Sequence, residues 1–159
     1  KNSEILDLCI QNFKEKPLSK EGFPESQLES RLESVQALMN ADNLVDITKN
    51  ILTNSTPDEW FKRGIKGLGK GCPTSAHIIW EQCNFENSKN LKEVFKFELD
   101  LAIQVTRHPD FTEGIRAVII EKDNQPQWSY ADINNLPREW IEEHLEPAWN
   151  KNPLDDLEN

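Results

Sequence analysis

A glycine-rich stretch is the first place where residue types and spacing could bind a ligand. Residues 64–71 read GIKGLGKG, which nearly fits the phosphate-binding pattern G-x-x-x-x-G-K-[ST]. In that pattern the hydroxyl after the lysine holds magnesium and a strand precedes the loop. Here Gly71 takes the hydroxyl's position, and residues 56–65 predict a helix. We therefore interpret the stretch as a glycine-rich helix terminus and exclude a nucleotide site.

The same region carries a basic patch in a chain whose formal net charge is −10. Lys62, Arg63, Lys66 and Lys70 lie between Trp60 and Trp80 with no acid among them. Such a patch could meet an anionic ligand. A solvated helix face is the simpler interpretation.

The remaining reactive side chains show no spacing that would build a catalytic or metal site. The three histidines lack metal-ligand spacing, the three cysteines form no C-x-x-C pair, and no G-x-S-x-G elbow accompanies Ser75. The residues concerned are His77, His108, His144, Cys9, Cys72 and Cys83. We predict no catalytic residue, no metal and no cofactor in this chain.

Composition narrows the class of protein. The 159 residues fit one compact domain, and 29% of them are charged. Residues 137–159 hold seven acids and two bases, so a nucleic-acid partner is not expected. No apolar run approaches the ~20 residues of a membrane span, and no signal peptide opens the chain. An odd number of cysteines favours a reducing, cytoplasmic or organellar compartment.

Periodicity predicts several helices. Apolar residues recur every three or four positions over 4–14, from 27 onward and from 44 to 52, with Asp42 or Asn43 as a cap for the third. Thr56 as N-cap and Pro57 in the first turn predict another helix, which Gly67, Gly69 and Gly71 would stop. Pro73 begins the next. We expect Asp110 to cap a short element reaching residue 122, and a late helix to follow.

Residues 91–107 are ambiguous by pattern. The odd positions 95–105 are apolar, which is a period of two and slightly favours a half-buried strand. A helix fits as well, because Leu91, Phe95, Leu99 and Ala102 would form one stripe. Pattern alone leaves both open.

A longer motif resembles a known family. Residues 108–123 read HPDFTEGIRAVIIEKD, followed by Pro126 and Trp128. This is similar to the C-terminal signature of the 3-hydroxyisobutyryl-CoA hydrolases in the crotonase superfamily, with its D-F-x-E-G-x-R-A core and a following D-K-D. Here Pro109 separates His108 from the core, and Glu121 stands at the first Asp of D-K-D. Upstream, residues 72–75 (CPTS) resemble the family's S-P-T-S helix start, and LKEV followed by Glu98 resembles its L-x-E-V-x-x-x-E helix.

The resemblance implies a fold class. It makes 91–107 helical, and it implies an all-α C-terminal region that packs on a crotonase β/α spiral core absent from this chain. The chain opens with Lys and its only Met is Met39, so either a tag and leader have been removed or the chain is a piece of a longer protein, and the resemblance favours the second. The predicted division is an N-terminal helix (1–15), a linker with helices (16–56), a helical domain with the signature (57–136), and a last helix with an acidic tail (137–159).

The resemblance also implies a function. We expect a non-catalytic part of an acyl-CoA thioester hydrolase that borders the acyl-CoA cleft, supports assembly and is inactive alone. Lys122 and Trp128 would contact CoA; a surface lysine and a packing tryptophan are the alternative. Glu113 and Arg116 would hold the turn after the long helix as an ion pair or as caps. The signature positions expected to be structural are Pro73, Asp110, Phe111, Glu113, Gly114 and Arg116.

Three sets of partners follow from this interpretation: the acyl-CoA substrate through the parent protein, the missing core, and a second copy in a homo-oligomer. The compartment would be cytoplasmic, or the mitochondrial matrix in a eukaryote. The alternatives are an enoyl-CoA hydratase or isomerase of other specificity, and a stand-alone all-α interaction domain.

Overall fold

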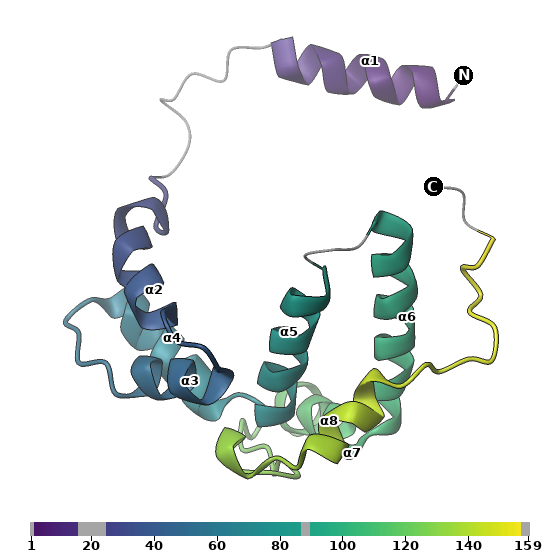
Figure 1. Ribbon diagram of the computed structural model, residues 1–159. Coiled ribbons are helices and arrows are strands. Elements are labelled where there is room, and N and C mark those ends of the chain that lie inside the picture. Colours follow the sequence, from purple (N-terminus) through teal and green to yellow (C-terminus); the bar gives the residue numbers. More distant parts are fainter. Residues whose placement is uncertain (1, 16–24, 87–89, 157–159) are drawn as a thin grey trace. The chain divides into compact units, whose positions relative to one another are not determined.

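The computed structural model describes residues 2–15, 25–86 and 90–156, and these residues form helices and turns with no strand among them (Figure 1). The chain divides into two compact units, residues 1–37 and 38–159. The first unit holds α1 (Asn2–Glu15), the 3₁₀ turn η2 (Glu29–Arg31) and the start of α2 (Leu32–Met39). The second holds α3 (Leu44–Leu52), α4 (Glu59–Lys70), α5 (Pro73–Glu86), α6 (Leu91–Arg107), α7 (Pro109–Ile115) and α8 (Arg138–Leu145).

Helix α4 begins and ends differently from the prediction. Its N-cap is Asp58, whose Oδ1 accepts a hydrogen bond from Trp60 N at 2.7 Å, so the assignment of Thr56 as cap is wrong. The hydroxyl of Thr56 instead accepts from Asp58 N at 3.1 Å. A carboxylate is the stronger acceptor at the positive end of a helix. The helix also continues through Gly67 and ends only at Gly71.

Residues 91–107 form one helix, α6, so the strand alternative is wrong and the helix implied by the family resemblance is confirmed. A capping box fixes its start: Asn90 Oδ1 accepts from Glu93 N at 2.9 Å, and the Glu93 carboxylate accepts from Asn90 N at 3.0 Å. Leu101 and Gln104 lie on its buried face. The period of two could not distinguish a strand from a helix, because two neighbouring stripes of this helix are apolar and together place an apolar residue at every second position.

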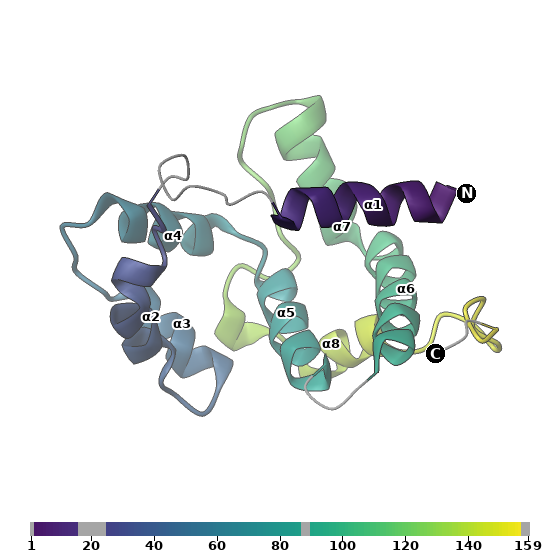
Figure 2. The same cartoon turned by 90° about the horizontal axis from the view of Figure 1, so that it is seen from above.

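The core of the second unit forms where α8 meets α5 and α6. Helix α6 contacts α7 and α8, and α8 also contacts α5. Seen from above, α8 lies between α5 and α6 (Figure 2). The buried apolar residues are Ile47, Ile78, Leu101, Ala117, Ile133 and Ile141. Among the described helices none is long and apolar enough to cross a membrane.

The signature begins at α7 and continues into a π-helical turn, η3 (Arg116–Ile120). Glu121 N donates to Arg116 O at 2.8 Å, five residues back, as a π turn requires. Lys122 and Asn124 then adopt positive φ angles of 58° and 54°, which turn the chain back along α7. Asp110 lies inside the first turn of α7 and His108 is the N-cap, so the predicted cap at Asp110 is wrong.

Candidate functional site

The Asp110 carboxylate joins four parts of the second unit. It is 8% exposed and accepts hydrogen bonds from Ser129 N at 2.7 Å and from the Thr74 hydroxyl at 2.8 Å. The Cys72 thiol lies 3.4 Å from the same carboxylate. The Thr74 hydroxyl in turn accepts from Trp140 Nε1 at 3.1 Å. One carboxylate therefore ties α7 to the start of α5, to the loop at Ser129 and, through Thr74, to α8.

These hydrogen bonds also fix the charge of Asp110. Burial raises the pKa of its carboxyl, but the bonds from Ser129, Thr74 and Cys72 outweigh burial and lower that pKa below its usual 3.8. The group is therefore ionised at neutral pH, and donors already occupy both oxygens. A general base needs a free lone pair near pH 7, so Asp110 is a structural acceptor. Burial is also the largest influence on Cys72, whose thiol pKa it raises, which makes that side chain a poor nucleophile.

Arg116 gathers the second polar cluster of the signature. Its guanidinium binds Glu113 in bidentate fashion, with Nε to Oε2 at 2.8 Å and Nη2 to Oε1 at 2.7 Å, so the predicted ion pair is present. It also binds Asp123 at 2.7 Å and pairs with Glu121. Glu113 Oε1 accepts from Gln127 N at 2.6 Å. The cluster closes the loop from 121 to 127 onto α7.

The pKa values agree with that role. The hydrogen bonds from Arg116 and then from Gln127 N lower the pKa of Glu113 to about 2, and Glu113 in turn raises the pKa of Arg116. Because the folded-state pKa of Glu113 is below its ordinary 4.5, this stabilisation is present above that pH. It is lost as the pH falls towards 2.

The two residues predicted to contact CoA differ in their surroundings. Trp128 is half-buried; its Nε1 donates to Lys70 O at 3.2 Å, and a Cβ on Gly114 would lie 3.4 Å from its ring. Lys122 is exposed at the turn after η3. Trp128 therefore packs against α7, which agrees with the alternative of a packing tryptophan. Lys122 lies on the loop that Arg116 holds against α7.

A cavity of about 370 Å³ is lined by three of the six signature positions, Asp110, Phe111 and Gly114. Its lining is largely apolar, its polar groups are Thr74, Ser75, Asp110 and two histidines, and Lys122 is not part of it. Phe111, Val118 and Ile119 line it and are 43%, 57% and 63% exposed, so the apolar surface continues outside the cavity. The full lining is Cys72, Thr74, Ser75, Ile78, Val105, His108, Asp110, Phe111, Gly114, Ile115, Val118, Ile119, Trp128 and His144.

His108 and His144 stack at one side of this cavity, with ring centroids 3.6 Å apart. His144 is 1% exposed, and its Nδ1 lies 2.7 Å from Trp140 O. A carbonyl oxygen only accepts, so we assign the proton to Nδ1 and a lone pair to Nε2. Burial first, and then His144, lower the pKa of His108, whereas Glu143 and Asp110 act in the opposite direction. The lowered pKa favours the neutral form of the His108 imidazole at pH 7.

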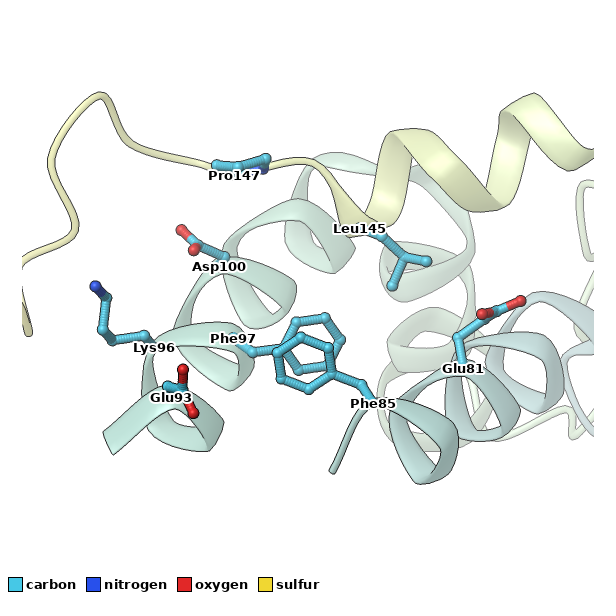
Figure 3. A pocket seen from close by; sticks show the side chains of 8 residues that line it. All are labelled: Glu81, Phe85, Glu93, Lys96, Phe97, Asp100, Leu145 and Pro147. Carbon is cyan, nitrogen blue, oxygen red and sulfur yellow. The ribbon is translucent and has the colours of Figure 1, made fainter. Parts of the chain in front are cut away.

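A larger cavity of about 460 Å³ lies between α5, α6 and the segment after α8 (Figure 3). Phe85 and Phe97 stack there with ring centroids 4.1 Å apart. Its charged groups already bind other parts of the fold: Lys96 pairs with Asp155, and Asp100 accepts from Ala148 N at 3.0 Å. This cavity is where the C-terminal segment attaches to α6, and its geometry does not support catalysis.

No group of three or more His, Cys, Asp or Glu side chains that could hold a metal ion occurs within residues 2–15, 25–86 and 90–156. The acids of the signature are engaged in hydrogen bonds and ion pairs. The described side chains therefore offer an apolar cavity and an anchored loop.

Comparison with known proteins identifies the family. The model of the enoyl-CoA hydratase/isomerase family matches residues 1–145. The chain belongs to the enoyl-CoA hydratase/isomerase family.

Relatives within this family carry more specific names. The chain is similar to the mitochondrial 3-hydroxyisobutyryl-CoA hydrolase of Homo sapiens, with 30% identity over 118 residues, 74% of this chain and 30% of that protein. It is also similar to 3-hydroxyisobutyryl-CoA hydrolase-like protein 5 of Arabidopsis thaliana, with 27% identity over 145 residues, 88% of this chain and 36% of that protein. The chain thus spans about a third of the length of these relatives.

A solved structure of an enoyl-CoA hydratase from Rhodobacter sphaeroides shares the fold. Its TM-score is 0.71 at 24% identity, and the match covers 92% of this chain and 43% of that one. The predicted fold class, an all-α region distinct from an absent core, is therefore wrong. The described residues are helical, as predicted, but the helices of nearly the whole chain have counterparts inside one enoyl-CoA hydratase chain, so they are part of that fold.

Three residues of this site, Thr74, Trp140 and His144, were not predicted from the sequence to belong to it. Thr74 lies in the matched helix start, one residue after Pro73, and that position is the signal that could have found it. Trp140 and His144 lie outside the matched motifs, in a helix recognisable only as amphipathic. Their contacts to Thr74 and His108 span long stretches of sequence and have no local signature.

Proposed function

We propose that the chain forms the C-terminal part of an acyl-CoA thioester hydrolase of the 3-hydroxyisobutyryl-CoA type. The observation that carries the proposal is the similarity to the human hydrolase, which extends over 118 residues. The hydrogen bonds of Asp110 and Arg116 add support, because they hold the loop of the signature in place. This gives both residues of the family motif a structural role.

In this proposal the described helices border the acyl-CoA cleft and supply binding surface. The cavity at α7 is apolar, and its exposed rim of Phe111, Val118 and Ile119 suits the uncharged part of an acyl-CoA. Lys122 is an exposed cation on an ordered turn, which suits the CoA phosphates. Trp128 lies beside that turn and would contribute through its ring.

Hydrolysis itself would depend on groups outside this surface. Water adds to the thioester carbonyl, backbone N–H groups stabilise the oxyanion, and the C–S bond breaks to release the CoA thiol after proton transfer. Donors occupy both oxygens of Asp110, so its carboxylate is not available as the base. We therefore propose that this part of the chain binds and orders, and is inactive alone.

The test is a comparison of two reactions catalysed by the protein that carries this sequence. 3-Hydroxyisobutyryl-CoA hydrolysis is followed by release of free thiol, and enoyl-CoA hydration by loss of the conjugated thioester. We expect kcat/KM for hydrolysis to exceed that for hydration by about 100-fold or more. Hydration with no thiol release would refute the hydrolase assignment.

The second candidate is an enoyl-CoA hydratase or isomerase of other specificity. The family's own description and the solved Rhodobacter sphaeroides structure favour it. A stand-alone interaction domain has less support, because the family model extends over residues 1–145. We further propose a cytoplasmic location, or the mitochondrial matrix in a eukaryote, as the human relative's name states for that protein, and action without a cofactor.

A further inference from the structure

The polar groups of the cavity at α7 are of two kinds. Both oxygens of Asp110 accept hydrogen bonds, and the Thr74 hydroxyl donates to Asp110 and accepts from Trp140. Ser75 is hydrogen-bonded to the Cys72 thiol. These groups hold the wall of the cavity together. The two stacked imidazoles on the same wall differ from them, because most of their ring nitrogens are not engaged.

His144 carries a buried lone pair that the described residues leave unused. Its Nδ1 lies 2.7 Å from Trp140 O, to which it donates, and its Nε2 has no hydrogen-bond partner within residues 2–15, 25–86 and 90–156. Every fully buried side-chain nitrogen or oxygen in that part of the chain does have a partner. Since His144 is only 1% exposed and lines the cavity, its Nε2 must open into the cavity. A hydrogen-bond acceptor is therefore available there.

His108 can supply the complementary donor. Its ring is half-buried on the cavity wall, and neither ring nitrogen has a hydrogen-bond partner among the residues that the structure describes. A neutral imidazole carries one N–H and one lone pair. The two rings stack with centroids 3.6 Å apart, so one ligand oxygen at a hydrogen-bond distance of about 2.8 Å can reach a nitrogen of each ring.

An acceptor beside a donor matches the chemistry of a hydroxyl group, which both donates and accepts. A carboxylate only accepts, so it would place its charge against the lone pair of His144 Nε2. An ammonium group only donates, so it would leave the N–H of His108 without an acceptor. The other walls are hydrocarbon, with Ile78, Val105 and Ile115 among them. The cavity therefore suits a short apolar group that carries one hydroxyl.

We propose that His108 and His144 recognise a hydroxyl on the acyl part of the substrate, so that this cavity selects hydroxyacyl thioesters over acyl thioesters of the same carbon skeleton. This inference rests on the proposed function, because it takes the cavity to be the part of the acyl-CoA cleft that this chain borders. The substrate hydroxyl donates to Nε2 of His144 and accepts from the N–H of His108. Both histidines act by binding, and no proton leaves the hydroxyl.

The expected selectivity follows from two hydrogen bonds between neutral groups. One such bond changes an equilibrium constant by about 2- to 12-fold, because water competes for the same atoms. A ligand without the hydroxyl leaves both nitrogens beside an apolar group that cannot pair with them. We therefore expect the hydroxyl to tighten binding by about tenfold or more.

Calorimetric titration of the protein that carries this sequence tests the proposal with two CoA thioethers. They are S-(3-hydroxy-2-methylpropyl)-CoA and S-(2-methylpropyl)-CoA, which differ only in the hydroxyl and cannot be hydrolysed. His108→Phe keeps a ring for the stack but removes both nitrogens, and His108→Gln restores one donor and one acceptor. The matched control is His77→Phe, which removes an imidazole that does not line this cavity. Circular dichroism confirms that each variant is folded.

A second measurement needs no variant. In wild-type protein labelled with ¹⁵N-histidine, the hydroxyl thioether should shift the signal of an unprotonated ring nitrogen, and the other thioether should leave it in place. Absence of that difference overturns the proposal even where His108→Phe does not fold.

The wild type and the control should bind the hydroxyl thioether about tenfold more tightly than the other. His108→Phe should lose this preference while its Kd for the plain thioether stays within about twofold, and His108→Gln should recover part of it. Equal binding of both thioethers by the wild type overturns the proposal. A preference that survives in His108→Phe also overturns it, as does an equal loss of affinity for both thioethers, which would mark a structural role.

These outcomes are separate from failure of the proposed function, because the thioethers release no thiol. Thiol release from 3-hydroxyisobutyryl-CoA together with equal binding of the two thioethers would overturn this inference alone. Absence of thiol release would instead overturn the hydrolase assignment.

Discussion

Replacing Asp110 with asparagine keeps the size of the side chain and removes its charge. The carboxylate accepts from Ser129 N at 2.7 Å and from the Thr74 hydroxyl at 2.8 Å. Asparagine has one acceptor oxygen, so its amide NH₂ must face one of these two donors. Rotating the Thr74 hydroxyl does not restore the lost hydrogen bond. The Thr74 oxygen would still accept from Trp140 Nε1, but its own proton would no longer point at an acceptor.

The cost follows from the burial of both groups, Asp110 at 8% and Thr74 at 3% exposed. Losing one charge-assisted hydrogen bond and leaving a buried donor unpaired costs about 1.5–3 kcal/mol of the free energy of unfolding. For a protein of this size the Tm should fall by roughly 3–12 °C. Thr74→Val removes the donor of the same hydrogen bond. The double variant should therefore lose less free energy of unfolding than the sum of the two single losses.

Thermal and chemical unfolding at pH 7 measures this loss, with Asp42→Asn as an exposed control expected within about 0.5 kcal/mol of the wild type. The pH dependence gives a second readout. The folded-state pKa of Asp110 is below 3.8, so its stabilisation is present above that pH and is lost as the pH falls through the folded value. Asp110→Asn should lack this part of the acid profile. An unchanged Tm together with an unchanged acid profile would refute the structural role.

Three further predictions concern the same cavity and its loop. Burial and His144 lower the pKa of His108, so the unfolded chain binds more protons, and the free energy of unfolding should decrease as the pH drops from about 6.5 towards the folded-state pKa. For His108→Gln, the plot of this free energy against pH should be flatter in that range. A slope identical to that of the wild type would contradict this. Gly114→Ala should change the free energy of unfolding by less than about 1 kcal/mol, because the added Cβ would lie in ordinary contact, 3.4 Å from the Trp128 ring. Gly114→Leu should displace that ring, lower the free energy of unfolding by about 1–3 kcal/mol and red-shift the tryptophan fluorescence. An unshifted spectrum would argue against the packing of Trp128 on Gly114. Lys122→Gln should raise KM for the acyl-CoA about two- to fivefold without changing kcat or Tm. The control Lys49→Gln should change none of the three. A KM for Lys122→Gln equal to that of the wild type would exclude Lys122 from the site.

The sequence predicted the local elements well because they depend on local chemistry. Asn43 and Pro73 mark helix starts by residue type, and both helices are present. The Glu113–Arg116 pair was foreseeable because three residues separate its members on a helix. Residues 91–107 could not be assigned from period alone, and the family resemblance supplied the correct helix.

The long-range contacts were not predictable in the same way. Asp110 was expected to cap a helix, a short-range role, but its partners Thr74 and Ser129 lie 36 and 19 residues away. The partners of Arg116 beyond Glu113 depend on a π turn and two positive φ angles that no residue pattern announced. The stacking of His108 on His144 joins α8 to the junction of α6 and α7, and neither sequence neighbourhood indicates it.

Hydrogen exchange of the protein with and without 3-hydroxyisobutyryl-CoA tests most directly whether this surface borders the acyl-CoA cleft. The account predicts increased protection over residues 111–128, which include the cavity rim and Lys122, with the α5–α6 cavity of Figure 3 unchanged. Protection confined to other segments, with residues 111–128 exchanging as in the free protein, would contradict it.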